Sequence, residues 1–205
     1  MPENLALLLK EVRACRTCGG KIPEPRPILN AHQDARVLIV GQAPGRKVHK
    51  TGIPWNDASG DRLRTWLDVD RDMFYDPRRF AIIPMGFCYP GKGPSGDLPP
   101  RRECAVLWMQ RLLAALPNIE LRILVGQYAH AYYLGKRRKK TLTATVRAWR
   151  EYWPEFLPLP HASPRNTGWF KYNPWLEKEV IPALRRHPAL RAIKRQHVDV
   201  HARLV

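Results

Sequence analysis

The sequence predicts an α/β fold, a three-layer α/β/α sandwich around a central, mostly parallel sheet of four strands. Short apolar runs alternate with segments of helical periodicity along the chain, which is typical of parallel sheets covered by helices on both faces. The runs are nearly continuous in apolar residues, as strands buried on both faces are. The predicted strands are residues 36–40, 80–85, 121–126 and 156–159.

Helical segments are predicted before and between these strands. An amphipathic helix is predicted over 3–15, where leucines and a valine recur on one face. The strand 36–40 runs directly into a glycine, as expected of a buried strand that ends in a functional loop. Helical patterns at 61–67 and 103–116 separate the first strand from the second and the second from the third.

Residues 1–205 are expected to form one domain. A chain with 44% hydrophobic and 26% charged residues is long enough for a sizeable core and too apolar for wholesale disorder. The stretch from about residue 185 is a basic C-terminal extension. Its composition fits a helix that frays, an arm that contacts phosphate, or a solvated tail.

The charge of the chain points to a polyanionic partner. Its 35 Lys and Arg against 18 Asp and Glu give a formal net charge of +17, so nucleic acid is the leading partner. Membrane-surface and ribosome-associated proteins share such basicity. No run approaches the roughly 20 apolar residues of a membrane span, and the N-terminus lacks the basic start of a signal peptide. We therefore expect a cytoplasmic monomer with no membrane partner.

Two loops and the segment between them hold the candidate chemistry. The first loop follows strand 36–40 and consists of Gly41, Gln42, Ala43, Pro44 and Gly45. Small residues let a backbone approach a ligand closely, and the proline fixes the turn. Such a turn alone is a weak signal, since it is neither a P-loop nor a dinucleotide fingerprint. In α/β folds, ligands bind beyond the carboxyl ends of the strands, where this loop is expected to lie.

Taken together, three segments resemble the motif set of uracil-DNA glycosylases. They are Gly-Gln-Ala-Pro-Gly at 41–45, Thr-Gly-x-Pro-aromatic at 51–55 and His-x-Ser-Pro-Arg-Asn at 161–166, within a match over roughly residues 12–182. The resemblance implies a DNA-repair hydrolase that flips uracil out of DNA containing damaged bases and excises it, which initiates base excision repair. No lysine is placed by motif to attack the sugar, so a monofunctional enzyme is expected.

The four cysteines have a characteristic layout. Cys15 and Cys18 are separated by two residues, and Cys88 and Cys104 by fifteen. In a reducing compartment, structural disulfides are not expected, so plain burial, a structural zinc ion or another metal site remain open. The layout is similar to that of the iron–sulfur branches of the superfamily. That similarity implies a structural [4Fe–4S] cluster held by the four thiolates.

The resemblance also assigns two side chains to the flipped base. Trp55 matches the aromatic residue that stacks on uracil, although a tryptophan beside a proline is also an ordinary core residue. His161 matches the histidine that donates a hydrogen bond to uracil O2, where it stabilises the developing negative charge. The alternative is a purely structural role, in which His161 caps a turn. Backbone N–H groups of the first loop would supplement it.

Two departures from the family pattern bear on mechanism and specificity. Ala43 stands where the uracil-specific branch has an aspartate. The segment 56–60 resembles a second iron–sulfur branch, in which an aspartate before x-Ser-Gly activates the water, if one residue is deleted here relative to that branch. This resemblance implies that Asp57 is the base, although Asp57 also looks like a helix N-cap. The asparagine that relatives place at the end of their third strand is missing from the corresponding stretch 83–87. Recognition of the base edge then falls to backbone groups near Gly86 and Phe87 or to Asn56, and looser discrimination among deaminated or small lesions is predicted.

The second loop also holds the predicted DNA contacts, which are Ser163, Arg165 and Asn166. Arg165 lies where the family inserts a wedge or clamps the backbone beside the vacated base. Two other functions remain open. One is a superfamily member that has lost excision and binds or crosslinks to damaged DNA. The other is a basic RNA- or ribosome-associated α/β protein with a zinc site.

Overall fold

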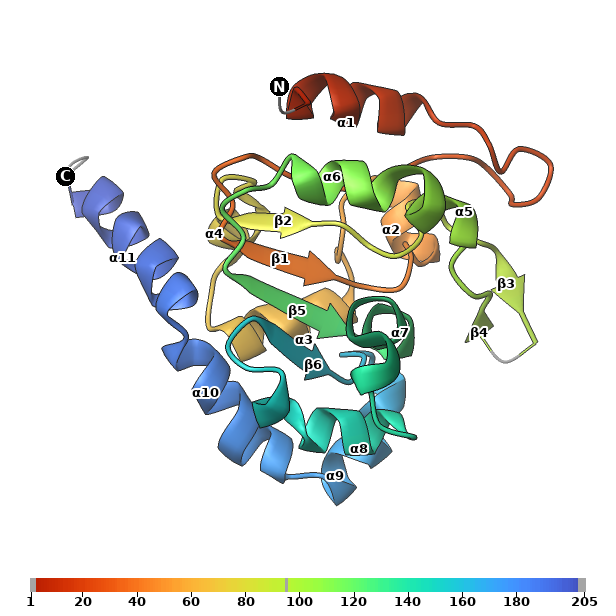
Figure 1. Ribbon diagram of the computed structural model, residues 1–205. Helices are drawn as coiled ribbons and strands as arrows, with labels where there is room; N and C mark the ends of the chain where they lie inside the picture. The colour runs from red at the N-terminus through yellow and green to blue at the C-terminus, as the bar shows by residue number, and fades with distance from the viewer. Residues whose placement is uncertain (1–2, 95, 203–205) are drawn as a thin grey trace.

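A computed structural model describes residues 3–94 and 96–202. Its central sheet has four strands in the order β2-β1-β5-β6 (Figure 1). Every neighbouring pair is parallel, so the sheet is wholly rather than mostly parallel. The strands are β1 (Val37–Val40), β2 (Phe80–Ile82), β5 (Leu121–Val125) and β6 (Phe156–Leu159).

The predicted strand 80–85 ends early, at Ile82. Ile83 still donates to the carbonyl of Ile39, but Pro84 has no N–H to continue the ladder. The strand predicted at 121–126 ends at Val125 because Gly126 turns the chain with a φ of 90°, a conformation that favours glycine.

The sheet is buried on both faces, as the continuous apolar runs predict. Val37 and Ile39 of β1 point into one core, whereas Leu38 and Val40 point into the other. All four side chains are inaccessible to solvent. This alternation follows from the period of two along a strand, and burial of both faces requires a helical layer on each side.

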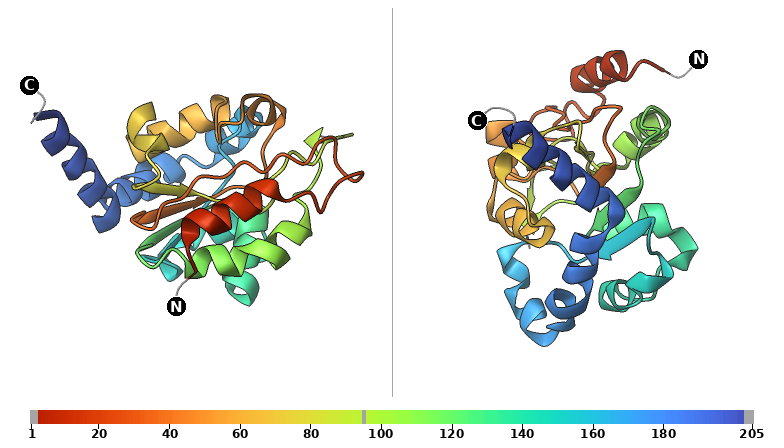
Figure 2. Two further views of the ribbon diagram at one scale, coloured as in Figure 1. Left: turned by 90° about the horizontal axis from the view of Figure 1, so that it is seen from above. Right: turned by 90° about the vertical axis from the view of Figure 1, so that its left-hand side faces the viewer.

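Helices supply those two layers, which Figure 2 shows on opposite sides of the sheet. One layer holds α1 (Leu5–Ala14), α5 (Arg102–Cys104), the π-helical turn Ala105–Met109, α6 (Gln110–Ala114) and α7 (Gln127–Leu134). The other holds α3 (Ala58–Leu67), α4 (Arg71–Tyr75), α8 (Leu142–Arg147), α9 (Thr167–Tyr172), the π-helical turn Leu176–Val180, α10 (Ile181–Arg186) and α11 (Pro188–Ala202).

The predicted helices are present with shifted boundaries. The helix predicted at 61–67 starts earlier, at Ala58, because Asp57 caps it. The helix predicted at 103–116 is divided into α5, a π-helical turn and α6. Shorter elements are α2 (Arg46–Thr51), the hairpin β3 (Lys92–Gly93) with β4 (Gly96–Asp97), and the 3₁₀ turns Gly135–Arg137, Trp149–Glu151 and Pro164–Asn166.

The basic C-terminal stretch begins as packed helix rather than as a solvated tail. Ala189, Leu190 and Ile193 of α11 are buried in the core. Arg79 donates to the carbonyl of Ile193, and Lys194 pairs with Asp68 at 2.8 Å. The far end of α11 extends away from the sheet (Figure 1). In the part of the chain that the structure describes, no helix is long and apolar enough to cross a membrane.

The carboxyl ends of the four strands lie together at one edge of the sheet. In Figure 1 the four arrows point toward the side where α2, α7 and the β3–β4 hairpin lie. The loops after β1 and β6 therefore meet at this edge, which is where the predicted site residues are expected.

Candidate active site

The two motif loops line one pocket of about 420 Å³ at this edge. The loop after β1 forms one wall, the loop after β6 forms another, and Trp55 and Asp57 come from the segment that leads into α3. The described residues that line the pocket are Ile28, Gly41, Gln42, Ala43, Pro44, Gly45, Val48, Pro54, Trp55, Asp57, Ser59, Ile82, Pro84, Pro90, Gly96, Asp97, Leu98, His161, Ser163, Arg165 and Asn166.

The first loop is tied to the segment after β2 by its backbone. The carbonyl of Gly41 accepts from the N–H of Met85 at 2.9 Å, and that of Gln42 accepts from Gly86 at 2.8 Å. A Cβ at position 41 would lie only 2.8 Å from the Trp55 indole. Glycine is therefore required at position 41 for the ring to lie across the strand end.

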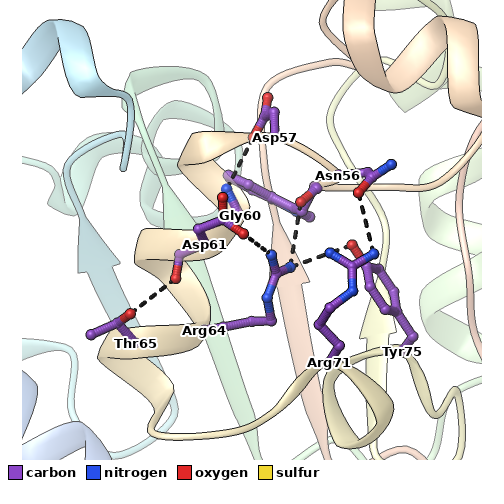
Figure 3. Close-up of polar contacts among 9 residues, drawn as sticks. Asn56, Asp57, Gly60, Asp61, Arg64, Thr65, Arg71 and Tyr75 are labelled. Carbon is purple, nitrogen blue, oxygen red and sulfur yellow. Dashed lines mark hydrogen bonds and ion pairs between the residues drawn. The ribbon is translucent and has the colours of Figure 1, made fainter.

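Trp55 adopts a left-handed backbone conformation, with a φ of 55°, which is costly for a bulky residue and must be held by its surroundings. The buried guanidinium of Arg64 lies 3.5 Å from the Trp55 carbonyl and 3.4 Å from the Tyr75 hydroxyl, and it pairs with Asp61 (Figure 3). The indole is partly buried and packs against the core while also lining the pocket. The position of Trp55 therefore fits both a residue that stacks on a base and an ordinary core residue.

Asp57 caps α3 and faces the pocket at once. Its Oδ1 accepts from the N–H of Gly60 at 3.0 Å (Figure 3), which satisfies an otherwise unpaired donor of the first helical turn. Its carboxylate also lies close enough to His161 to oppose the burial that lowers the pKa of the imidazole. The cap and a chemical role are therefore compatible in this geometry.

His161 is held as a neutral hydrogen-bond donor. Burial lowers the pKa of its imidazole below the usual value, and the Asp57 carboxylate opposes that shift. Its Nδ1 lies 3.2 Å from the N–H of Ser163 and accepts from it, so the ring proton belongs on Nε2. The ring stacks beside Trp55, with centroids 5.7 Å apart and planes 29° apart. Nε2–H is therefore a donor that a base in the pocket can use.

The loop after β6 is braced internally. Asn166 donates from Nδ2 to the carbonyl of His161 at 2.8 Å, and the Ser163 hydroxyl accepts from the N–H of Arg165 at 3.2 Å. Arg165 itself is exposed at the pocket rim. A Cβ placed on Gly96 of the hairpin would lie 2.8 Å from its guanidinium, so Arg165 lies against β4.

Three predicted base-edge residues do not line the pocket. Asn56 accepts from Arg71 at 3.3 Å (Figure 3) and is not among the residues that line the pocket. The N–H of Gly86 is bonded to the first loop. Phe87 is a core residue, with its ring buried and its N–H 3.4 Å from the Cys104 sulfur. The N–H groups of Gly86 and Phe87 are thus occupied within the protein.

The sequence did not single out Ser59 and Asp97, which also line the pocket. Asp97 is an exposed carboxylate on β4 that accepts from the Tyr89 hydroxyl at 3.4 Å. Its position in the loop after β2, at the same sheet edge as the two motif loops, is the signal that could have identified it. Ser59 lies in the first turn of α3, two residues after Asp57.

The pattern of motif residues around one pocket agrees with a comparison to known families. The family model described as the uracil DNA glycosylase superfamily matches residues 29–185. The chain belongs to this superfamily. Members are generally glycosylase hydrolases, and the wholly parallel sheet between helical layers fits their α/β fold.

In this superfamily member the four cysteines lie close enough together to interact electrostatically. Burial raises the pKa of the Cys88 thiol to about 12 and that of Cys104 to about 11, and the charges of Cys15 and Cys18 add to both shifts. Cys18 and Cys88 pack together with Ile22. Within residues 3–94 and 96–202, however, no three His, Cys, Asp or Glu side chains are arranged as a metal-ion site.

Two buried N–H groups lie beside this cysteine set. The indole of Trp108 interacts with the Cys15 sulfur, and Arg101 interacts with the Cys18 sulfur. Among the described residues, neither the Trp108 Nε1 nor the Arg101 Nε makes a hydrogen bond to any other group. Buried N–H donors beside a thiolate can stabilise its negative charge. The chemistry of the donor set therefore fits an anionic thiolate-bound group.

Proposed function

We propose that this superfamily member is a monofunctional DNA glycosylase that flips uracil, and other deaminated or small lesion bases, into the pocket and excises them, which initiates base excision repair. One observation carries the proposal: His161 lines the same pocket as Trp55 and Asp57, although it lies about a hundred positions later in the sequence. Its volume of about 420 Å³ suits a flipped base.

Breaking the glycosidic bond places positive charge on the sugar and negative charge on the departing base. The bond electrons move to the base nitrogen, and the developing charge on uracil O2 is stabilised by the Nε2–H of His161. A neutral imidazole suits this role because it donates without protonating the base. Trp55 offers its indole face as a stacking platform.

Asp57 is proposed to orient and deprotonate the water that attacks the sugar carbon. One of its oxygens accepts from Gly60, and a carboxylate has a second oxygen that can accept from water. The water oxygen forms the new bond to the sugar, and its proton passes to Asp57. Ala43 offers no carboxylate for this purpose.

The proposed substrate range is broad because the groups expected to read the base edge are engaged within the protein. Asn56 is bonded to Arg71, and the N–H groups of Gly86 and Phe87 are occupied. Without an amide dedicated to the base edge, the site does not discriminate strongly against a related base. We therefore propose that other deaminated bases are excised alongside uracil.

DNA is the proposed partner. The net charge of +17 favours the phosphate backbone, and membership of the superfamily favours DNA over RNA or the ribosome. Ser163, Arg165 and Asn166 at the pocket rim are proposed contacts to the strand that flanks the flipped base. Arg165, which is exposed, is proposed as the clamp or wedge.

Cys15, Cys18, Cys88 and Cys104 are proposed to hold a structural [4Fe–4S] cluster. Their thiols, and the N–H donors of Trp108 and Arg101 that interact with Cys15 and Cys18, suit such a group. When bound, the cluster would tie the segment after α1 to the chain around α5. Iron and sulfide analysis of protein purified without oxygen is expected to give about four of each per chain. A stoichiometric zinc content without iron would contradict the assignment.

Excision is tested on a panel of oligonucleotides that carry uracil, hypoxanthine or xanthine, followed by alkaline cleavage of abasic sites. Asp57→Asn separates the two roles of Asp57, because asparagine caps helices as well as aspartate does but cannot accept a proton. The matched control is Asp70→Asn, since Asp70 caps α4 through Met73 in the same way. We expect Asp57→Asn to lose excision by roughly 100-fold and Asp70→Asn to retain it.

The other outcomes are equally informative. Efficient excision of uracil alone would contradict the broad substrate range. If Asp97→Asn rather than Asp57→Asn abolished the rate, the pocket carboxylate on β4 would be the base instead. Tight binding or a covalent adduct without base release would favour the second candidate, a damaged-DNA-binding or crosslinking protein. The observation in favour of this candidate is that Ala43 provides no carboxylate.

A further inference from the structure

Arg62 of α3 contacts the His161 loop from behind the pocket. Its Nη1 donates to the carbonyl of Ala162 at 3.2 Å and to that of Ser163 at 3.1 Å. The guanidinium also lies over the Phe170 ring, 4.6 Å from its centroid. These contacts fix the cation in place, although Arg62 does not line the pocket.

One of the two carbonyls belongs to the peptide that controls His161. The carbonyl of Ala162 and the N–H of Ser163 are opposite ends of a single planar peptide unit. Arg62 binds the oxygen end of that unit, and the nitrogen end donates to Nδ1 of His161 at 3.2 Å. A cation on the oxygen polarises the peptide, which makes its N–H a stronger donor. It also fixes the plane, and hence the direction of the N–H.

We propose that Arg62 is a positioning residue that acts through the Ala162–Ser163 peptide to keep the ring proton of His161 on Nε2, toward the pocket. The inference rests on the proposed function of His161 as the donor to the base. With Arg62 in place, the N–H of Ser163 occupies Nδ1, so a proton on Nδ1 would leave two donors facing each other. Without Arg62 the peptide can rotate, and the other tautomer becomes accessible.

The charges around His161 define the expected pH behaviour. The Asp57 carboxylate favours the protonated ring, whereas burial and the bond at Nδ1 favour the neutral ring. Arg165 and Asp97 line the same pocket from the rim and the hairpin. Removing Arg62 weakens the bond at Nδ1 and removes a nearby positive charge. Both changes raise the pKa of His161, so the acid limb of the rate profile should move to higher pH.

The experiment is nitrogen NMR of the imidazole rings in protein labelled at its histidines, with the His161 signals identified by their loss in His161→Asn. The test variant is Arg62→Gln, and Arg62→Lys is the conservative variant that keeps a cation. The matched control is Arg185→Gln. Arg185 likewise donates to two backbone carbonyls, but they are those of Thr65 and Trp66 in α3 rather than those of the His161 loop.

We expect the wild-type spectrum to show the Nε2–H tautomer, and Arg62→Gln to show a mixture of tautomers with a raised His161 pKa. Single-turnover excision by Arg62→Gln is expected to fall about tenfold with little change in DNA affinity. Arg62→Lys should recover part of the rate. Arg185→Gln should keep the wild-type tautomer and rate, even where its melting temperature falls.

A wild-type tautomer and His161 pKa in Arg62→Gln would overturn the inference, whatever happened to stability. The tautomer measurement needs no substrate. If no base is excised by the wild type but the tautomer shifts in Arg62→Gln, the proposed function fails while the role of Arg62 stands. If excision is robust but the tautomer does not respond to Arg62, the inference alone fails.

Discussion

Replacing Gly60 with alanine is expected to displace Trp55 from the pocket. Gly60 lies in the first turn of α3, and a Cβ at this position would lie 1.7 Å from the carbonyl oxygen of Trp55. That distance is half of the 3.4 Å at which ordinary contact begins. The obstructing atom is backbone, so rotation of a side chain cannot relieve the clash. The segment that holds Trp55 must therefore move by more than an ångström.

The rate and the stability are expected to respond differently to Gly60→Ala. Misplacement of a substrate-positioning group by about 1 Å can cost roughly 100-fold in rate, and we expect a loss of this size in single-turnover excision. Alanine is favoured over glycine in a helix by about 1 kcal/mol, which partly offsets the cost of the displaced loop. Thermal unfolding should therefore show a smaller effect than the rate does.

The matched control for this substitution is Gly168→Ala. Gly168 lies in α9, and a Cβ there would meet nothing within 4 Å. We expect this variant to keep the wild-type rate and to lose no stability. Wild-type excision by Gly60→Ala, together with unchanged tryptophan fluorescence, would refute the reasoning that glycine is needed to seat Trp55.

Three further predictions concern the free energy of unfolding and DNA binding. Arg64→Met removes the buried donor to the Trp55 carbonyl and should cost about 1–3 kcal/mol in urea unfolding. Asp61→Asn, on the exposed side of the same ion pair, should cost less than about 1 kcal/mol; equal losses would contradict this view of the network. His130 donates from Nε2 to two strand carbonyls, and burial lowers its pKa to about 4. Because the unfolded chain takes up a proton at His130 more readily than the folded protein does, the free energy of unfolding of the wild type should fall by about 3 kcal/mol relative to that of His130→Gln as pH falls from 6.5 toward 4. Parallel curves of unfolding free energy against pH for the two proteins would contradict this. Arg165→Ala should weaken DNA binding and reduce the slope of log K against log salt by about 1; an unchanged slope in a salt titration would exclude a phosphate contact by Arg165.

Much of the fold follows from local patterns. The run at 37–40 is apolar at every position, and such a run is stable only between two helical layers, so the sandwich was predictable from the strands alone. Strand ends were less predictable, because they depend on single residues such as Pro84. The π-helical turn at Ala105–Met109 has no signal in the apolar pattern, since a helical segment with one widened turn keeps nearly the same periodicity.

The candidate site also has features that the sequence predicts and features that it does not. The motif loops were predictable because parallel strands bring their carboxyl ends to one edge, which gathers the loop after β1 and the loop after β6 regardless of their separation in sequence. The backbone near Phe87 was assigned to the base edge from its place after β2, but the N–H of Phe87 lies 3.4 Å from the Cys104 sulfur. A position after a strand fixes the edge of the sheet and leaves the hydrogen-bond partners of the backbone there undetermined.

The sequence by itself determined the class of fold, the edge of the sheet at which the two motif loops meet and the residue types at 41–45 and 161–166. Only the tertiary structure decided which atoms face one another. It brings Asp57 to His161, leaves Asp97 at the rim and places Arg62 on the peptide that holds Nδ1 of His161. The physical reason is that hydrophobic periodicity is a local property, whereas a hydrogen bond between residues a hundred positions apart depends on how whole layers pack.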